Sequence, residues 1–192
     1  MENQLNEHNT NFKEAPNRFS YFKGPITNTQ PKSEVTLVDV YNLIKGDFFK
    51  AATSALREIS DIKLAKKYKA GHFDYVTFSG LFSQRCNSRL RIHSGLLTVD
   101  FDHVPNKHEL RSALLADQYF ETELLFTSPS GDGLKWIIPI HPSVELHYKY
   151  FDAVLNYVLA AYNQNIDPTG REVSRACFLP HDPEVYINPK YL

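Results

Sequence analysis

Two aspartates, Asp100 and Asp102, follow an apolar run in the segment LLTVDFDHV, residues 96–104. Side chains alternate across a β-strand, so both carboxylates would point to one face while Val99 and Phe101 point to the other. Carboxylates are the ligands that Mg²⁺ and Mn²⁺ prefer, and two such ions can hold a triphosphate and activate an attacking hydroxyl. The spacing therefore predicts a divalent-cation site. The alternative is a strand that has reached solvent, with both aspartates in the following turn.

A third carboxylate and a set of phosphate-binding groups lie further along the chain. Asp167, in NIDPTGREVSR, is the expected third metal ligand. The loop SPSGDG, residues 128–133, offers hydroxyls and free backbone N–H groups suited to phosphate oxygens. The expected nucleotide-binding residues are Ser128, Ser130, Gly131, Gly133, Lys135, Arg171 and Arg175. The alternatives are a plain hairpin turn for the loop, a turn acid for Asp167, and exposure to solvent or an ion pair with Glu172 for the arginines.

Hydrophobic periodicity predicts the elements that hold these residues. Strands are expected over residues 96–102, 122–127, 135–140 and 176–179, and helices over 105–117 and 147–162. This β-α-β-β-α-β order is that of an RRM-like, or ferredoxin-like, sheet, so the fold class is α+β. In that topology the first and third strands are antiparallel neighbours, and the fourth flanks the first. The order predicts that the three carboxylates meet Lys135, Arg171 and Arg175 on one sheet face.

The rest of the chain is predicted to form an arm and an N-terminal addition of helices and a strand. Residues 1–34 are rich in Asn, Glu, Lys and Pro without a sustained period, which predicts a flexible arm. A helix is expected to begin at Thr36, with Asp39 completing a capping box. The expected domain covers residues 35–192, with an N-terminal subregion at 35–94 and an RRM-like core at 95–188 that holds the candidate catalytic residues.

Composition excludes several classes of protein. The chain is 42% hydrophobic and 22% charged, as globular proteins are. Its two cysteines cannot build a disulfide framework or a four-cysteine zinc site, and its eight histidines show no zinc-ligand spacing. No apolar run reaches transmembrane length, no signal-peptide core opens the chain, and no P-loop motif supplies an ATPase site. We therefore expect a cytoplasmic protein with no membrane partner and no ATPase motor of its own.

The charge of the chain is unevenly spread. The net charge of −1 gives no overall attraction to nucleic acid. Residues 57–91, however, hold eight basic residues against three acidic ones. A solvated helix face over KLAKKYK explains this run equally well. If the segment covers one side of the sheet, it offers cations to the backbone of a template strand.

The motifs TVDFD, SPSGDGLKW and NIDPTGREVSR together resemble those of the archaeo-eukaryotic primase, or primase-polymerase, superfamily. With TFSGLF and SRACFLPHDPEVYIN, the chain looks closest to the primase-like N-terminal domain linked to virulence-associated E-type helicases in bacterial and mobile-element replication proteins. The resemblance covers roughly residues 70–190.

The resemblance implies a function, a cofactor and partners. The chain would be a template-directed nucleotidyltransferase acting in DNA replication or mobile-element maintenance. It would bind nucleoside triphosphates, Mg²⁺ or Mn²⁺, and a single-stranded DNA template, with a fused or associated helicase as a further partner. The implied catalytic and metal-binding residues are Asp100, Asp102 and Asp167.

One position departs from the superfamily pattern. Most members carry a His where this sequence has Lys135. A lysine still supplies positive charge to a phosphate, but it cannot act as a neutral imidazole donor. The alternative function is therefore a catalytically degenerate module of the same fold that binds DNA or positions a helicase. A third interpretation is an unrelated Asp-x-Asp transferase that uses a sugar nucleotide.

Overall fold

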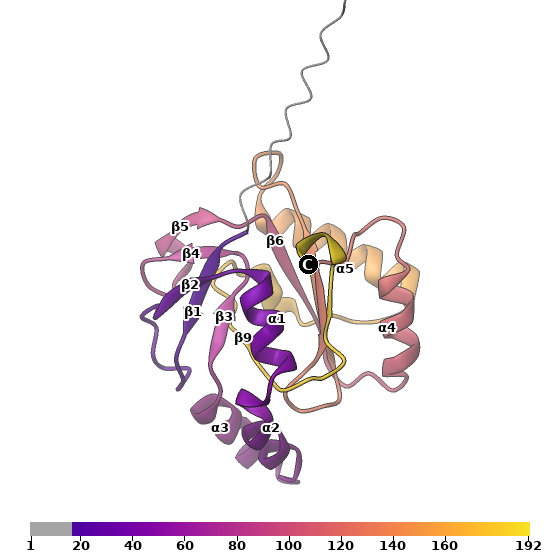
Figure 1. Cartoon of the computed structure of the whole chain (residues 1–192). Coiled ribbons are helices and arrows are strands. Elements are labelled where there is room, and N and C mark those ends of the chain that lie inside the picture. The colour runs from indigo at the N-terminus through magenta and orange to yellow at the C-terminus, as the bar shows by residue number, and fades with distance from the viewer. Residues whose placement is uncertain (1–16) are drawn as a thin grey trace, which may run out of the picture.

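The computed structural model describes residues 17–192. Over this range the chain is a mixed α+β fold with five α-helices and antiparallel sheets, shown in Figure 1. The predicted α+β class is confirmed. Residues 1–16, which belong to the predicted arm, lie outside the described range.

The N-terminal part contains five short strands and three helices. The strands are β1 (Phe19–Phe22), β2 (Ser33–Val35), β3 (Tyr75–Thr77), β4 (Gly80–Phe82) and β5 (Leu90–His93). The helices are α1 (Leu37–Lys45), α2 (Lys50–Arg57) and α3 (Ile62–His72), with 3₁₀ turns η1 (Asp47–Phe49) and η2 (Asn87–Arg89). The predicted capping box is present: Asp39 accepts from the Thr36 N–H at 2.8 Å, and the Thr36 hydroxyl accepts from the Asp39 N–H. It fixes the start of α1.

The C-terminal part contains the longer strands and helices. The strands are β6 (Leu96–Phe101), β7 (Leu124–Thr127), β8 (Leu134–Pro139), β9 (Cys177–Phe178) and β10 (Tyr186–Ile187). The helices are α4 (Lys107–Leu115) and α5 (His147–Tyr162), with 3₁₀ turns η3 (Pro168–Arg171) and η4 (Pro189–Tyr191). The four strands and two helices predicted for this part are all present within a few residues, and β10 is an addition that the sequence pattern did not predict.

The first sheet has the strand order β2-β1-β3-β9, with β1 as an inner strand. All four residues of β1 are buried. The prediction of a flexible arm is therefore wrong for residues 17–34, which supply β1 and the first two residues of β2. The aromatic segment FSYF is only four residues long and lies in a polar, proline-containing stretch. Its hydrophobic pattern is therefore too short to indicate a β-strand.

The second sheet has the order β10-β7-β8-β6. The predicted pairing of the first and third core strands is confirmed, because β6 and β8 are antiparallel neighbours with Asp100 opposite Lys135. The predicted place of the fourth strand is wrong. Strand β9 pairs with β3 in the first sheet, and β10 takes the edge beside β7. Only two residues of β9 form ladder pairs, and the segment before it lies across the end of β6 instead of pairing along it.

The second sheet is buried on both faces. On one face the side chains pack against α4 and α5, among them Val99, Phe101, Trp136 and Ile138. On the other face they pack against α1 and the first sheet, among them Leu96, Leu124, Phe126 and Ile137. The strand alternation predicted around Asp100 is confirmed, so this carboxylate points to the face that lies toward the first sheet.

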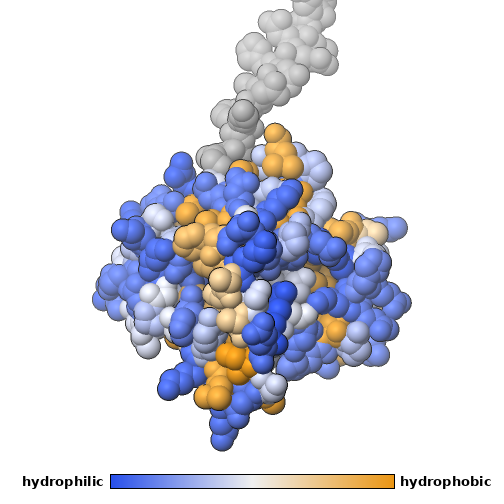
Figure 2. Space-filling model, turned by 60° about the horizontal axis from the view of Figure 1, so that its bottom comes forward, coloured by the Kyte–Doolittle hydropathy of each residue, from blue (hydrophilic) through white to orange (hydrophobic). Residues whose placement is uncertain are grey.

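The surface around α2 and α3 is mostly hydrophilic. Figure 2 turns this end of the molecule forward and shows small hydrophobic patches among hydrophilic side chains. Two of the exposed apolar residues, Ile62 and Leu64, lie in α3. Within residues 17–192, none of the helices has the length and apolar character needed to cross a bilayer.

Candidate active site

Three carboxylates meet at the end of β6. Asp100 lies in β6, Asp102 follows it, and Asp167 is the N-cap residue of η3. One oxygen from each carboxylate lies within 4.8 Å of the others, with Asp100 buried, Asp167 half-buried and Asp102 exposed. Oxygen ligands surround Mg²⁺ at about 2.1 Å, so this spacing can place three carboxylates around one ion. The three residues predicted as metal ligands therefore lie together in an arrangement that can hold a metal ion.

The backbone of β6 holds Asp167 in place. The Asp167 N–H donates to the Asp100 carbonyl at 2.9 Å, and the Asp167 carboxylate accepts from the Thr169 N–H at 2.9 Å and the Thr169 hydroxyl at 2.7 Å. Gly170 permits this close approach, because a Cβ there would lie 3.1 Å from the Thr98 carbonyl and 2.6 Å from the Phe151 ring. The η3 turn is thus fixed against β6 by its backbone as well as by its side chains.

Two cations pair with these carboxylates. Lys135 forms an ion pair with Asp100 across the β6–β8 ladder. Arg175 lies 3.2 Å from the second oxygen of Asp100 and also pairs with Asp167. Lys135 and Asp100 are only 8% and 3% exposed. Removing one member of a buried ion pair leaves an uncompensated charge, so the carboxylates and their cations depend on one another.

The site shifts the pKa of two of its groups. Burial raises the pKa of the Asp167 carboxyl, but hydrogen bonds from Thr169 and the charge of Arg175 outweigh it, and the pKa lies below its ordinary value. Burial lowers the pKa of Lys69, and the like charge of Lys135 lowers it further. Asp167 is therefore ionised at neutral pH, as a metal ligand must be.

The carboxylates open into a cleft of about 660 Å³. Cations from three other parts of the chain line it: Lys66 and Lys69 from α3, Arg85 from the loop after β4, and Arg175. Arg85 is held by its donor bonds to the Tyr75 hydroxyl and the Ile26 carbonyl, both 3.1 Å. The other lining residues include Ser128, Ser130, Ser174, Ala176 and Phe178. The cleft thus combines a carboxylate cluster with several cationic side chains. This combination suits a polyanion that binds through a divalent cation.

The loop SPSGDG reaches this cleft, but the backbone N–H groups of its two glycines form hydrogen bonds within the loop. The Gly131 N–H donates to the Ser128 carbonyl at 2.9 Å, and the Gly133 N–H donates to the Ser128 hydroxyl at 3.1 Å. The expectation of free N–H groups at these glycines is therefore wrong. Gly133 has a packing role, since a Cβ there would lie 2.1 Å from the Phe101 carbonyl. The hydroxyls of Ser128 and Ser130 remain on the lining of the cleft.

Helix α2 holds the same loop from the other side. Arg57 donates to the Pro129 carbonyl at 3.2 Å and to the Ser128 carbonyl at 3.3 Å. Gly131 has φ +86°, and a Cβ there would meet the Arg57 guanidinium at 2.9 Å. The basic residue at position 57 thus has a structural partner, while other cations of the 57–91 segment face the cleft.

Arg171 does not join the other predicted residues. Its guanidinium forms a two-point ion pair with Asp152 of α5, with both N–O distances 2.9 Å, and it packs over the Tyr148 ring. It is absent from the lining of the cleft. The sequence order placed Arg171 near Asp167 correctly, but the η3 turn directs the two side chains apart.

The sequence analysis did not single out Lys66, Lys69 and Arg85 as site residues. Lys66 and Lys69 are three residues apart in α3, so both reach the cleft from one helix face. That spacing was visible in KLAKKYK, but a solvated helix face has the same spacing. A second hollow of about 380 Å³ adjoins the cleft and shares Lys66, Lys69, Asp102 and Ser130 with it.

Comparison with known proteins identifies a domain family. The family described as "BT4734-like, N-terminal domain" matches residues 68–187. The chain belongs to this family. The matched range runs from within α3 to β10 and contains the three carboxylates, Lys135 and Arg175. Searches of curated proteins and of solved structures found no match to the chain.

Proposed function

We propose that this domain of the BT4734-like family is a primase-polymerase-type nucleotidyltransferase. It would bind nucleoside triphosphates and Mg²⁺ or Mn²⁺, and extend a strand on a single-stranded template. The observation that carries the proposal is the position of Asp100, Asp102 and Asp167 in one cleft with Lys135 and Arg175. The run β6-α4-β7-β8-α5 also keeps five of the six elements of the superfamily's sheet in order.

The divalent ion would be held by the three carboxylates and would supply charge neutralisation at the triphosphate and activation of the attacking hydroxyl. The chain's own cations would then change partners. Lys135 and Arg175 neutralise Asp100 in the free protein, and a cation at the carboxylates repels them. Triphosphate oxygens at the cleft offer the displaced ammonium and guanidinium new anionic acceptors. Positioning and electrostatics of this kind account for most of phosphoryl-transfer catalysis.

The N-terminal part of the fold would bind the template strand. Lys66, Lys69 and Arg85 line the cleft beside the carboxylates and are suited to phosphate groups of a nucleic-acid backbone. Action in the cytoplasm, in DNA replication or mobile-element maintenance, with an associated helicase to supply single-stranded template, completes the proposal.

A specific observation favours a second function, a degenerate binding module of the same fold. Lys135 stands in place of the superfamily's usual His, and its buried ion pair with Asp100 opposes entry of a metal ion. Such a module would bind nucleic acid or a helicase without turnover. The two functions share the cleft and differ in whether nucleotidyl transfer takes place there.

A primer-synthesis assay separates them. Purified protein is incubated with single-stranded DNA, labelled ribo- or deoxyribonucleotides, and Mg²⁺ or Mn²⁺, beside the Asp102→Asn variant. Template-dependent product with the wild type and none with the variant supports the enzyme. Metal-dependent nucleotide binding without product selects the binding module. Hydrolysis of a sugar nucleotide with no response to template would reject both.

A further inference from the structure

The two halves of the described chain carry opposite charge. Residues 17–93 contain thirteen Lys and Arg against six Asp and Glu, a net charge of +7. Residues 94–192 contain seven Lys and Arg against thirteen Asp and Glu, a net charge of −6. The small overall charge of −1 therefore results from large positive and negative charges that nearly cancel. Such asymmetry directs a polyanion to one half of the surface and away from the other.

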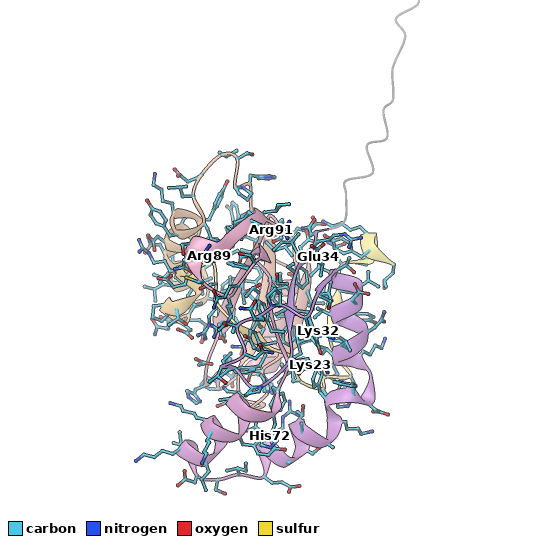
Figure 3. The ribbon with its side chains drawn as sticks, turned by 90° about the vertical axis from the view of Figure 1, so that its left-hand side faces the viewer. Lys23, Lys32, Glu34, His72, Arg89 and Arg91 are labelled. Atoms are coloured by element: carbon cyan, nitrogen blue, oxygen red, sulfur yellow. The ribbon has the colours of Figure 1, made fainter. Side chains whose placement is uncertain are left out.

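Several cations of the positive half have side chains without a protein partner in the described part of the chain. Among them, within residues 17–192, the side chains of Lys32, Arg89 and Arg91 make no ion pair, hydrogen bond or cation–π contact, and all three residues are exposed. Figure 3 shows these residues on one side of the molecule, together with Lys23 and Glu34. Lys23 is partly neutralised by its ion pair with Asp74. The three free cations define what we call the basic face: Lys32 before β2, Arg89 in η2 and Arg91 in β5.

We propose that the basic face binds the sugar-phosphate backbone of single-stranded nucleic acid and holds the strand that enters the cleft. The inference rests on the proposed function and extends it to a surface outside the cleft. An unpaired surface cation that meets a phosphate gives up no existing ion pair and releases a condensed counterion from the strand. Arginine adds two-point contacts to phosphate oxygens.

One end of the basic face adjoins the rim of the cleft. Lys32 and Arg91 line one shallow groove of about 170 Å³. Arg89 is two residues from Asn87, whose side-chain Nδ2 contacts Glu172 and whose side-chain Oδ1 accepts from the Ser174 hydroxyl at 2.7 Å. Glu172 and Ser174 both line the cleft, so η2 forms part of its rim. A strand leaving the cleft over this rim meets Arg89 first and then the groove of Lys32 and Arg91.

Charge reversal tests the face directly. The triple variant Lys32→Glu, Arg89→Glu, Arg91→Glu is compared with Lys45→Glu, Lys50→Glu, Lys149→Glu, which changes the net charge equally at three exposed cations outside the face. Binding of a fluorescent thymidine 20-mer is followed by anisotropy at several salt concentrations. We expect the face variant to bind at least about tenfold more weakly at low salt and to lose about 2 from the slope of log K against log salt, near 0.7 per lost phosphate contact. The control variant should keep most of the wild-type slope of log K against log salt.

Thermal melting checks that both variants fold, and titration with a nucleoside triphosphate and Mn²⁺ separates this inference from the proposed function. Normal nucleotide binding in the face variant with reduced strand binding supports the inference. Unchanged strand binding in the face variant, or an equal loss in the control, overturns it while leaving nucleotide binding as evidence for the proposed function. Wild-type protein that binds anionic vesicles but no oligonucleotide would also overturn it.

Discussion

Asp100 lies directly opposite Lys135 in the β6–β8 pair, and their side chains form an ion pair in which both partners are buried. Arg175 reaches the second oxygen of the same carboxylate. Asp100 therefore balances two cations in addition to its place among the three carboxylates. Asp102 shares only the second role, because it is exposed and forms no ion pair within residues 17–192.

This difference predicts different stabilities for two matched variants. In metal-free protein, Asp100→Asn should lower Tm by about 6–20 °C, because removing one member of a buried ion pair costs roughly 3–5 kcal/mol. Asp102→Asn should change Tm by less than about 2 °C, as substitutions at exposed sites usually do. Thermal melts by circular dichroism in the presence of a chelator measure both. Equal changes in the two variants would contradict the structural role of Asp100.

Metal binding should appear as stabilisation. Mg²⁺ or Mn²⁺ that binds only the folded protein raises Tm with concentration, and a chelator reverses the rise. Asp102→Asn and Asp167→Asn should each lose most of this response, because each removes one ligand of the carboxylate cluster. Glu58→Gln, at an exposed acid in another part of the fold, is the control and should respond as the wild type does. A response that survives in both aspartate variants would place the ion elsewhere.

Lys135 should contribute to nucleotide binding. Lys135→Ala is expected to weaken the binding of a nucleoside triphosphate in the presence of Mn²⁺ by about 1.5–3 kcal/mol, the range for a hydrogen bond to a charged group. Lys135→His should keep much of the affinity and increase primer extension, because it restores the side chain that most of the superfamily carries.

Arg171→Ala is the matched control for that experiment, since Arg171 pairs with Asp152 and is absent from the lining of the cleft. It should leave nucleotide affinity unchanged, as measured by the same titration. If affinity is unchanged in Lys135→Ala, then Lys135 serves only to balance Asp100.

The part of the site that lies on regular strands was predictable from the sequence. Alternation along β6 and β8 sufficed to place Asp100 and Lys135 on one face, away from Trp136. The direction of Arg171 was not predictable, because it depends on the η3 turn and on a partner nineteen residues earlier, Asp152. Likewise, the two-residue strand β9 has too little sequence to show which sheet it joins.

A histidine pair links the β4–β5 hairpin to the turn that carries Asp167. The Gly95 N–H donates to His93 Nδ1 at 3.0 Å, so the proton of neutral His93 is on Nε2 and is donated to His147 Nδ1 at 3.0 Å. The remaining proton of His147 then lies on Nε2, 3.3 Å from the Gly170 carbonyl. Each link has one donor and one acceptor only when both imidazoles are neutral. Burial, together with the neighbouring His147, lowers the pKa of His93 to about 4.

The pair predicts the direction of a pH effect on stability. The unfolded chain binds a proton at His93 near pH 6.5, while the folded chain binds it near pH 4. The free energy of unfolding is therefore highest above pH 6.5 and falls as the pH drops toward 4. Tm measured between about pH 7.5 and 5 should decline in the wild type and decline less in His93→Gln. Equal slopes would assign the acid sensitivity to other groups.

The eleven residues from Asp167 to Cys177 connect the two sheets. Their first backbone N–H is bonded to β6 at Asp100, and their last residue pairs with β3 at Val76. Any displacement of one sheet against the other must change the distance between Asp167 and Asp100 or stretch this connection. A ligand that shifts the first sheet thereby alters the affinity of the carboxylates for a cation, and a bound cation alters the affinity for that ligand by the same factor. The segment from Asp167 to Cys177 would be the physical connection between the two binding events, and their reciprocity follows from thermodynamic linkage.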